Sequence, residues 1–349
     1  MPNCAETPRA RRIRIFLETT LYVILLCIII PIRINHDAEQ FEKYLKVFNK
    51  SYDNYTMYRK RFEAFKTSLR AIDLLNANRT DESAKYGLTK YSDLLPEEFV
   101  KTKLLPEKDY LTHIHDPSPV SKSPISKRST KYNLPKRVDW RERNAVSGIQ
   151  SQGTCGACWA FSVIGVVESM IALKTGKLEK LSVQQMIDCS MYNDGCDGGD
   201  ICSLLKWIKT ESVSIVEETH YPLSLTKQEC KNVSGIDGIL IDGFECDSFV
   251  NDEEIILAFL AKHGPVAVAI NARSWQHYVG GIIQFHCESS PLKLNHAVQI
   301  VGYDLTANIP HYIVKNSWGE DFGEDGYLYI AIGKNLCGLA HEVSAVKVL

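Results

Sequence analysis

The sequence predicts an α+β protein in which a helical half is followed by a half rich in strands. Apolar residues recur at helical spacing over residues 159–173, 182–188 and 200–209. Farther along, apolar runs bounded by glycine and polar turns are typical of strands and cover residues 265–270, 296–303, 311–316 and 326–332. This change of secondary structure midway along the chain predicts two packed subdomains with a cleft between them.

The bulk composition argues against a nucleic-acid-binding protein. The chain has 349 residues, of which 45% are hydrophobic and 23% charged, and its formal net charge is -2 at pH 7. Such a length allows two or three structural units, each with a core of its own. Because no basic block stands out, the chain lacks the electrostatic signature of a nucleic-acid partner. We expect no cofactor and no bound metal.

The N-terminus carries the pattern of a targeting segment. Four arginines between residues 9 and 14 precede an apolar run over residues 21–32. A membrane span needs about 20 apolar residues, so this shorter run favours a secretory signal peptide. No small-x-small cleavage site follows the run, and an uncleaved signal anchor therefore stays open for residues 1–36.

A secretory route changes the interpretation of the cysteines. The chain has 11 of them, and in an oxidising compartment most cysteines form disulfides. The same compartment suits N-glycosylation, for which the chain offers sequons at Asn49, Asn54, Asn78 and Asn232.

Residues 37–104 form a separate helical unit in this interpretation. Apolar and aromatic residues recur at helical spacing over residues 41–48 and again over residues 58–75. Residues 105–133 that follow contain several prolines among serines and lysines. This composition predicts an exposed, extended linker that proteases cleave readily.

The segment QGTCGACWAF, residues 152–161, places Cys155 and Cys158 three residues apart. A zinc site would need a second pair at metal spacing, and the next cysteines in the chain form no further CxxC. A thioredoxin-like dithiol has its tryptophan before the first cysteine, whereas here Trp159 follows the second. A nucleophilic cysteine needs a distant base and an orienting group, and His296 and Asn316 lie downstream in suitable order.

Four motifs together resemble the papain-like cysteine peptidases, which include the lysosomal cathepsins. They are QGTCGACWAF, CDGG at residues 196–199, NHAV at 295–298 and NSWG at 316–319. The resemblance covers roughly residues 40–349. It implies a papain-like fold over residues 134–349, with a helical left half and an antiparallel, β-barrel-like right half, preceded by a helical inhibitory propeptide.

The resemblance also assigns catalytic roles. Cys158 would be the nucleophile, held as a thiolate by the imidazolium of His296 and by a helix N-terminus. His296 would protonate the leaving amine, and Asn316 would orient the imidazole behind the shield of Trp318. The side-chain amide of Gln152 would bind the oxyanion, a contribution of about 3 kcal/mol.

Substrate contacts follow from the same resemblance. They are expected from Gly198, Gly199, Ile201, Ala269, Leu294, Ala297, Trp318 and Glu342. Four of them (Ile201, Ala269, Leu294 and Ala297) would make an apolar pocket for the P2 side chain, two residues before the scissile bond. Glu342 would lie at the floor of that pocket and admit a P2 arginine. The alternatives are that Glu342 faces solvent or pairs with His341 or a lysine.

The resemblance implies three disulfides among the cysteines that follow Leu134: Cys155–Cys196, Cys189–Cys230 and Cys287–Cys337. Cys202 and Cys246 are left over. They form either an extra bridge or two free thiols, and we expect free thiols because no family bridge covers them.

Two departures from the family pattern bear on specificity and packing. Phe322 stands where the family usually has a second tryptophan, which keeps aromatic packing but loses an indole N–H. Cys189 and Cys196 lie too close for the histidine-bearing loop that makes cathepsin B a dipeptidase. We therefore expect a cleft open at both ends, and an endopeptidase.

The front segment partly matches the propeptides of cathepsins. Matching positions are Arg61, Phe65, Ile72, Asn76, Gly87 and Asp93, whereas Met57, Ser68, Thr89 and Tyr91 depart from the pattern. Such a propeptide would thread the cleft in a direction that resists cleavage. Acid would release it as carboxylates such as Asp93 are protonated. The new N-terminus is expected between Lys122 and Arg137.

These observations predict a cysteine endopeptidase made as a zymogen and active in an acidic endolysosomal lumen, or secreted. Its expected partners are protein or peptide substrates, its own propeptide and cystatin-like inhibitors, and we expect a monomer. Two alternatives remain: a catalytically inactive papain-like binding protein and an inhibitor built on the propeptide module.

Overall fold

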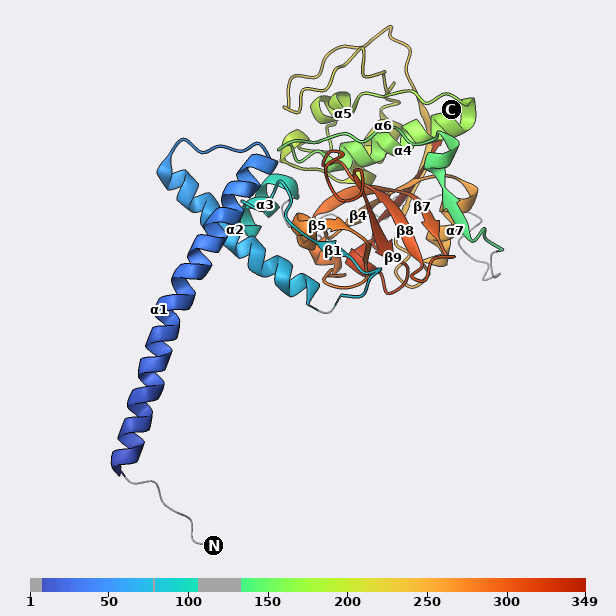
Figure 1. Cartoon of the computed structure of the whole chain (residues 1–349). Helices are drawn as coiled ribbons and strands as arrows, with labels where there is room; N and C mark the ends of the chain where they lie inside the picture. The colour runs from blue at the N-terminus through green and yellow to red at the C-terminus, as the bar shows by residue number, and fades with distance from the viewer. Residues whose placement is uncertain (1–7, 78, 106–132) are drawn as a thin grey trace.

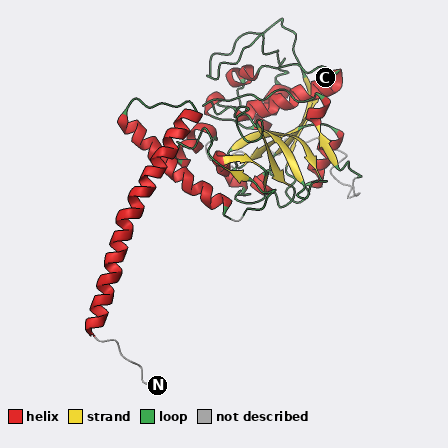
Figure 2. Cartoon of the chain, viewed as in Figure 1, coloured by secondary structure: helices red, strands yellow, loops and turns green. Residues whose placement is uncertain are grey.

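A computed structural model gives the fold of the chain and describes residues 8–77, 79–105 and 133–349 (Figure 1). The sequon at Asn78 and nearly all of the predicted linker lie outside these ranges. The N-terminal helix projects from a body in which helices and strands occupy separate regions (Figure 2). The predicted α+β class is confirmed.

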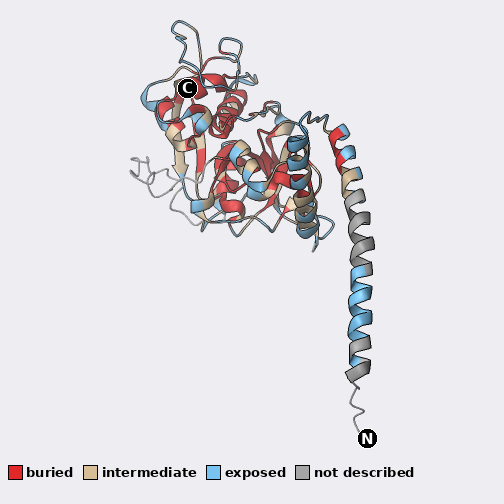
Figure 3. Cartoon of the chain, turned by 90° about the vertical axis from the view of Figure 1, so that its left-hand side faces the viewer, coloured by how far each residue is buried: buried red, intermediate tan, exposed pale blue. Residues whose placement is uncertain are grey.

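Two crossing helices form the first unit. Helix α1 (Pro8–Val47) runs without a break through residue 36, and α2 (Tyr55–Asn76) packs across its C-terminal end. Phe41, Tyr44 and Phe65 are buried where the helices meet, with ring centroids 5.1 to 6.1 Å apart. The predicted aromatic spacing therefore builds a small core of its own, while the described side chains near the start of α1 are exposed (Figure 3).

The helical half consists of α4 (Cys158–Thr175), α5 (Val183–Cys189) and α6 (Ile201–Thr210), with a 3-10 turn, η3, at Gly195–Asp197. Within the described ranges, α4 is the one helix long and apolar enough to cross a membrane, but most of it is buried in the core of this half. The side chains of Ser182 and Asp200 cap α5 and α6 by accepting N–H groups of the first turn. All three helices lie within two residues of their predicted bounds.

The strand half is built on one sheet, in which seven strands lie in the order β3-β10-β4-β7-β8-β9-β6 and an eighth, β2, pairs with β7. The pairings are antiparallel apart from β6 with β9. The strands are β2 (Arg137–Asp139), β3 (Ile241–Asp247), β4 (Val266–Ile270), β6 (Ile282–Ile283), β7 (His296–Asp304), β8 (His311–Lys315), β9 (Tyr327–Ala331) and β10 (Val343–Val348).

Shorter elements complete this half. Helix α7 (Glu254–Lys262) covers the sheet, and β5 (Tyr278–Gly280) lies outside it. The 3-10 helices are η2 (Trp140–Arg143), η4 (Arg273–His277), η5 (Pro291–Lys293) and η6 (Leu336–Gly338). Strands β4, β7, β8 and β9 were predicted, whereas β3, β10 and α7 were not.

The two halves meet along helix α4. This helix packs against β7, β10 and β4, so its buried surface is shared between a helical core and the sheet. Cys158 is the first residue of α4 and His296 is the first residue of β7. The fold therefore brings the predicted nucleophile and base to one end of the interface between the halves.

The front unit docks on the strand half. Strand β1 (Lys85–Tyr86) pairs with β5, and the N–H of Gly87 donates to the carbonyl of His277 at 2.8 Å. Helix α3 (Pro96–Lys103) follows, and the N–H of Leu105 then donates to the carbonyl of Asn295 at 2.7 Å. The front segment thus reaches the residue before His296, as a segment threading the cleft requires.

Four disulfides form among the cysteines that follow Leu134. Three are the predicted pairs, and the fourth joins Cys202 on α6 to Cys246 on β3. The expectation of two free thiols was wrong, because β3, which the sequence pattern did not reveal, brings Cys246 within 6.0 Å (Cα to Cα) of Cys202. Among the cysteines after Leu134, Cys158 alone forms no disulfide.

Candidate active site

Cys158 lies at the N-terminus of α4 and is fully buried. Its sulfur belongs to the first turn of an 18-residue helix, where unpaired N–H groups and the helix dipole favour a negative charge. A thiol in this position loses its proton more readily than an ordinary cysteine. The prediction that Cys158 begins the long apolar helix is confirmed, whereas its role as the nucleophile stays a prediction.

His296 is held by Asn316. The ring Nε2 lies 2.8 Å from the side-chain oxygen of Asn316, which also accepts the N–H of Ser317 at 2.9 Å. Because that oxygen can only accept, Nε2 carries the proton and donates it. The other ring nitrogen, Nδ1, is buried and makes no hydrogen bond among the residues that the structure describes. The ring is therefore fixed in the tautomer that leaves Nδ1 available as a base.

Aromatic rings enclose the imidazole. The ring of Trp318 lies 4.8 Å from that of His296, and Trp275 stands edge-on to it at 5.9 Å. Phe322 packs edge-on against Trp318 at 4.8 Å. Both Trp318 and Phe322 are buried, so they keep water away from the bond between His296 and Asn316. Phe322 supplies the aromatic packing that was expected of it.

Burial governs the charge of the base. It lowers the pKa of His296 to about 4, although the hydrogen bond to Asn316 acts in the opposite direction. A buried imidazolium therefore needs a nearby negative charge to be stable at higher pH. A thiolate at Cys158 is the partner that the catalytic interpretation requires.

Gln152 is anchored between the cysteine loop and the Asn316 loop. Its side-chain amide donates to the carbonyl of Cys155 at 2.9 Å, and its amide oxygen accepts from the hydroxyl of Ser317 at 2.7 Å. The backbone N–H of Gln152 donates to the carbonyl of Ser317 at 2.9 Å. The amide nitrogen carries two protons, so one remains for a further acceptor. Ser317, which the sequence analysis did not single out, fixes the orientation of this amide.

Gly198 and Gly199, the two glycines predicted to contact substrate, are required by the fold for different reasons. Gly198 has a φ of 133°, which L side chains rarely adopt. A Cβ on Gly199 would meet the ring of Trp159 at 2.5 Å. Gly199 is therefore required for packing against helix α4, irrespective of any contact with a substrate backbone.

The apolar pocket residues come from both halves. Ile201, Leu294 and Ala297 are buried, and Ala269 is partly exposed. Ile201 starts α6, whereas the other three belong to β4, to β7 and to the turn before β7.

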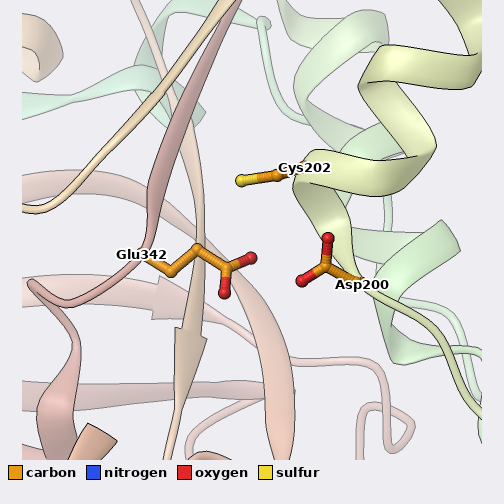
Figure 4. Close-up of side chains that lie close together, drawn as sticks. All are labelled: Asp200, Cys202 and Glu342. Atoms are coloured by element: carbon orange, nitrogen blue, oxygen red, sulfur yellow. The ribbon is translucent and has the colours of Figure 1, made fainter. Parts of the chain in front are cut away.

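Glu342 lies between the same elements. The N–H of Ala269 donates to its backbone carbonyl at 3.1 Å, and its carboxylate faces the start of α6 (Figure 4). There the carboxylate oxygens of Glu342 and Asp200 and the sulfur of Cys202 lie within 4.8 Å of one another. His341 turns elsewhere and contacts the carbonyl of Ser289 at 2.9 Å.

Asp200 was not predicted as a site residue. It directly follows the CDGG motif, and this position was the signal that could have identified it. The sulfur of Cys202 belongs to a disulfide and is not a thiolate, so the group does not offer three metal ligands. What the arrangement provides is two carboxylates beside the predicted P2 pocket.

The front segment covers the site. The rings of Tyr91 and Phe99 lie edge-on to Trp318 at 6.0 and 5.5 Å. The ammonium of Lys90 donates to the carbonyl of Trp318 at 2.7 Å, and that of Lys103 donates to the carbonyl of Gly153. These contacts engage the loops that carry Trp318 and Gln152.

A charged cluster holds the front segment together. Asp93 is almost fully buried and accepts hydrogen bonds from Lys50, at 2.5 Å, and from the hydroxyl of Tyr52. Arg61 donates to the carbonyl of Asp93 at 3.1 Å and to the carboxylate of Glu98 at 2.8 Å. Asp93 therefore acts within the front unit and not directly against the strand half.

Three of the predicted sequons lie in the part of the chain that the structure covers. Asn49, Asn54 and Asn232 are all exposed. The side chain of Asn54 also caps helix α2 by accepting the N–H of Thr56 at 2.7 Å. N-glycosylation stays a prediction at all four sequons.

Comparison with known proteins agrees with this geometry. Residues 134–347 match the papain family cysteine protease domain, and residues 41–99 match the cathepsin propeptide inhibitor domain (I29). Human cathepsin O is 40% identical over 288 residues, which cover 82% of this chain and 87% of that protein. Mouse cathepsin O is 38% identical over 287 residues, covering 82% and 89% respectively. The stretch at residues 274–287, SWQHYVGGIIQFHC, had suggested cathepsin O from the sequence, and this resemblance is confirmed.

Solved proforms share the fold. The proform of the ragweed pollen allergen Amb a 11 cysteine protease has a TM-score of 0.77 and 32% identity, covering 89% of this chain and 92% of that one. Digestive procathepsin L2 of Tenebrio molitor has a TM-score of 0.77 and 30% identity, covering 89% and 99%. With matching domains, relatives and geometry, the chain belongs to the papain family of cysteine proteases and carries a propeptide of the cathepsin type.

Proposed function

We propose that this protease is an endopeptidase zymogen in which Cys158 and His296 form the reacting pair. The observation that carries the proposal is the bond from His296 Nε2 to Asn316, which leaves Nδ1 of a buried imidazole without another partner among the described residues. Cys158 at the start of α4 is the one cysteine after Leu134 that forms no disulfide.

The reaction runs in two halves. The Cys158 thiolate attacks the carbonyl carbon of the scissile peptide bond, and the oxyanion is bound by the spare amide proton of Gln152 and the N–H of Cys158. His296 passes its proton to the leaving amine as the C–N bond breaks and a thioester forms. Water then gives a proton to His296 and attacks the thioester, which releases the carboxylic acid and restores the thiolate.

The propeptide contacts support latency. Lys90 and Lys103 bind carbonyls on the two loops that hold the catalytic side chains, and Leu105 binds the residue before His296. A substrate cannot occupy these positions while the propeptide is bound. Acid release of the propeptide suits an endolysosomal lumen reached through the secretory pathway, with residues 1–36 as signal peptide or anchor.

A chain that kept this fold only for binding is the second candidate. It would require the loss of the nucleophile or the base, and both Cys158 and His296 are present. Labelling of the processed enzyme with a thiol-directed epoxysuccinyl inhibitor tests the proposal. We expect one label per chain, on Cys158, and loss of peptidase activity in step with labelling. A processed chain that takes up no label is not a cysteine peptidase.

A further inference from the structure

Helix α4 begins at Cys158 and strand β7 begins at His296, and the two elements pack against each other. The buried side-chain amide of Gln299 forms hydrogen bonds between them. Gln299 lies three residues beyond His296, about 10 Å along a strand at about 3.3 Å per residue. Gly165 lies seven residues beyond Cys158, also about 10 Å along a helix at 1.5 Å per residue. The amide of Gln299 donates to the carbonyl of Gly165 and to the hydroxyl of Ser169, both at 2.9 Å. These two bonds connect the element that carries the nucleophile to the element that carries the base.

The helix is shaped to accept this amide. A Cβ on Gly165 would lie 2.7 Å from the amide oxygen of Gln299, closer than van der Waals contact allows. Glycine within a helix is less favourable than alanine. A residue that is unfavourable in a helix therefore occupies the position where the Gln299 amide approaches α4. The bond to the Gly165 carbonyl, which can only accept, also fixes which end of the amide is nitrogen.

Gln299 also borders a small cavity. The amide oxygen of Gln299 is buried and has no hydrogen-bond partner among the described residues, and the same holds for the side-chain nitrogen of Asn316. Both residues line one cavity of about 20 Å³. One water molecule needs about 10 to 15 Å³ and two to four polar partners. An acceptor on Gln299 and a donor on Asn316 are complementary to a single water.

We propose that Gln299 is a positioning residue for the catalytic pair. It sets the separation of Cys158 and His296 by fixing α4 against β7, and it holds a buried water that orients Asn316. This inference rests on the proposed function, because it concerns the geometry of the same two reacting groups. Moving α4 away from β7 would leave the buried N–H groups of Gln299 without acceptors. The free-energy cost of such an unpaired donor exceeds the net gain of an ordinary hydrogen bond, so the packing of α4 against β7 resists change.

Two variants disturb the amide in different ways. Gln299→Met removes both donors at similar volume, and Gly165→Ala pushes the unchanged amide away from α4 while raising helix propensity. Gln184→Met is the matched control, because Gln184 is a buried glutamine whose amide bonds to Asp188 and Thr226 within the helical half. The measurements on the processed enzymes are kcat and KM, the melting temperature, and the pH dependence of Cys158 alkylation by iodoacetamide.

We expect Gln299→Met and Gly165→Ala to lower kcat by about tenfold to hundredfold, the cost of a misplacement near 1 Å, with KM changed little. The acid limb of the alkylation profile should move to higher pH in both, because a displaced imidazolium stabilises the thiolate less. Gln184→Met should lower the melting temperature and leave kcat and the profile as in the wild type. A crystal structure of the processed wild-type enzyme should show a water between Gln299 and Asn316.

Several results would overturn the proposal. If Gln299→Met melts earlier but keeps the wild-type kcat and alkylation profile, Gln299 has a structural role alone. If that variant does not fold, Gly165→Ala decides, and an unchanged kcat in it has the same meaning. An empty cavity in the crystal structure removes the water-mediated part. A wild-type enzyme that the epoxysuccinyl inhibitor does not label contradicts the proposed function itself, which keeps the two failures distinct.

Discussion

The imidazole of His296 donates its Nε2 proton to the side-chain oxygen of Asn316 across 2.8 Å, beneath the buried ring of Trp318. This bond leaves Nδ1 as the ring nitrogen that is available to accept a proton. It also works against the burial that lowers the pKa of His296 to about 4. If these residues act as proposed, replacing each of them should lower peptidase activity by a different amount.

Replacement of the reacting groups should be far more costly than replacement of the orienting group. We expect Cys158→Ser to abolish turnover, and His296→Ala to lose nearly as much, because a nucleophile and its base act as one unit. Asn316→Ala should retain more activity, since it removes orientation but not proton transfer. Values of kcat/KM with one peptide substrate test this order. Peptidase activity in Cys158→Ser that the epoxysuccinyl inhibitor still blocks would contradict the assignment of the nucleophile.

The disulfide pattern predicts a single reactive thiol in the processed enzyme. All cysteines after Leu134 except Cys158 form disulfides, so titration of the unfolded, unreduced chain should find one thiol. The double variant Cys202→Ser, Cys246→Ser should be less stable by roughly 2 to 4 kcal/mol, because that bridge closes a loop with a sequence separation of 44. Denaturant unfolding measures the loss. Three titratable thiols in the wild type would contradict the fourth bridge.

Propeptide release should depend on Glu98. Burial raises the pKa of this carboxyl, but the hydrogen bonds from Lys60 and the N–H of Leu95 and the charge of Arg61 outweigh it, and the pKa lies below its usual value. A carboxyl with a lowered pKa stabilises the folded propeptide above its unfolded pKa of about 4.3, and this contribution is lost as the pH falls through the folded pKa. Acid therefore weakens the propeptide.

The wild-type zymogen should convert at about pH 4 to 5.5 and stay latent near neutrality, with the contribution of Glu98 lost at the acid end of this range, below its reference pKa of about 4.3. Mass spectrometry should place the new N-terminus between Lys122 and Arg137. Glu98→Gln should shift the conversion to higher pH, whereas Glu97→Gln, at an exposed neighbour on the same helix, should not. Equal shifts in the two variants, or full activity of the intact wild-type chain, would argue against this trigger.

The sequence predicted where Cys158 and His296 lie in the fold because both begin strong local patterns. Cys158 opens the longest apolar helix of the peptidase region, and His296 opens a continuous apolar strand. Strand β3 escaped prediction because IDGFECD has a glycine and three acidic residues, and its pairing with β10 decides its conformation. The Cys202–Cys246 bridge depends on that strand and was missed with it.

Side-chain contacts between elements far apart in sequence could not be predicted from local sequence patterns. The approach of Gln299 to Gly165 depends on how β7 packs against α4, and neither residue belongs to a motif. The same is true of Asp200 and Glu342, which are far apart in sequence and whose carboxylates approach each other only in the folded structure. Gly199 belongs to the CDGG motif that the sequence analysis used, but the sequence did not reveal that a side chain at this position would clash with Trp159.

Substrate choice should depend on Glu342. Its carboxylate is directed toward Asp200 at the start of α6, beside the buried Ile201 of the predicted P2 pocket (Figure 4). A P2 arginine that reaches a partly desolvated carboxylate gains roughly 1 to 3 kcal/mol, or about 5- to 150-fold in specificity. We therefore expect substrates with arginine at P2 to be cleaved as well as those with leucine. Their rate relative to leucine should rise between about pH 4 and 6, because carboxyl groups lose their protons in that range.

The comparison uses two peptides that differ only at P2, assayed from pH 4 to 6. Glu342→Ala should lower the ratio of kcat/KM for arginine to that for leucine and flatten its pH dependence. Asp200→Asn should lower the ratio less, because Asp200 also caps α6 by accepting the N–H of Ser203 at 2.6 Å. Glu229→Ala removes an exposed carboxylate elsewhere in the helical half and should leave the ratio unchanged. An arginine-to-leucine ratio in Glu342→Ala that follows the wild type at every pH would mean that Glu342 does not bind the P2 side chain.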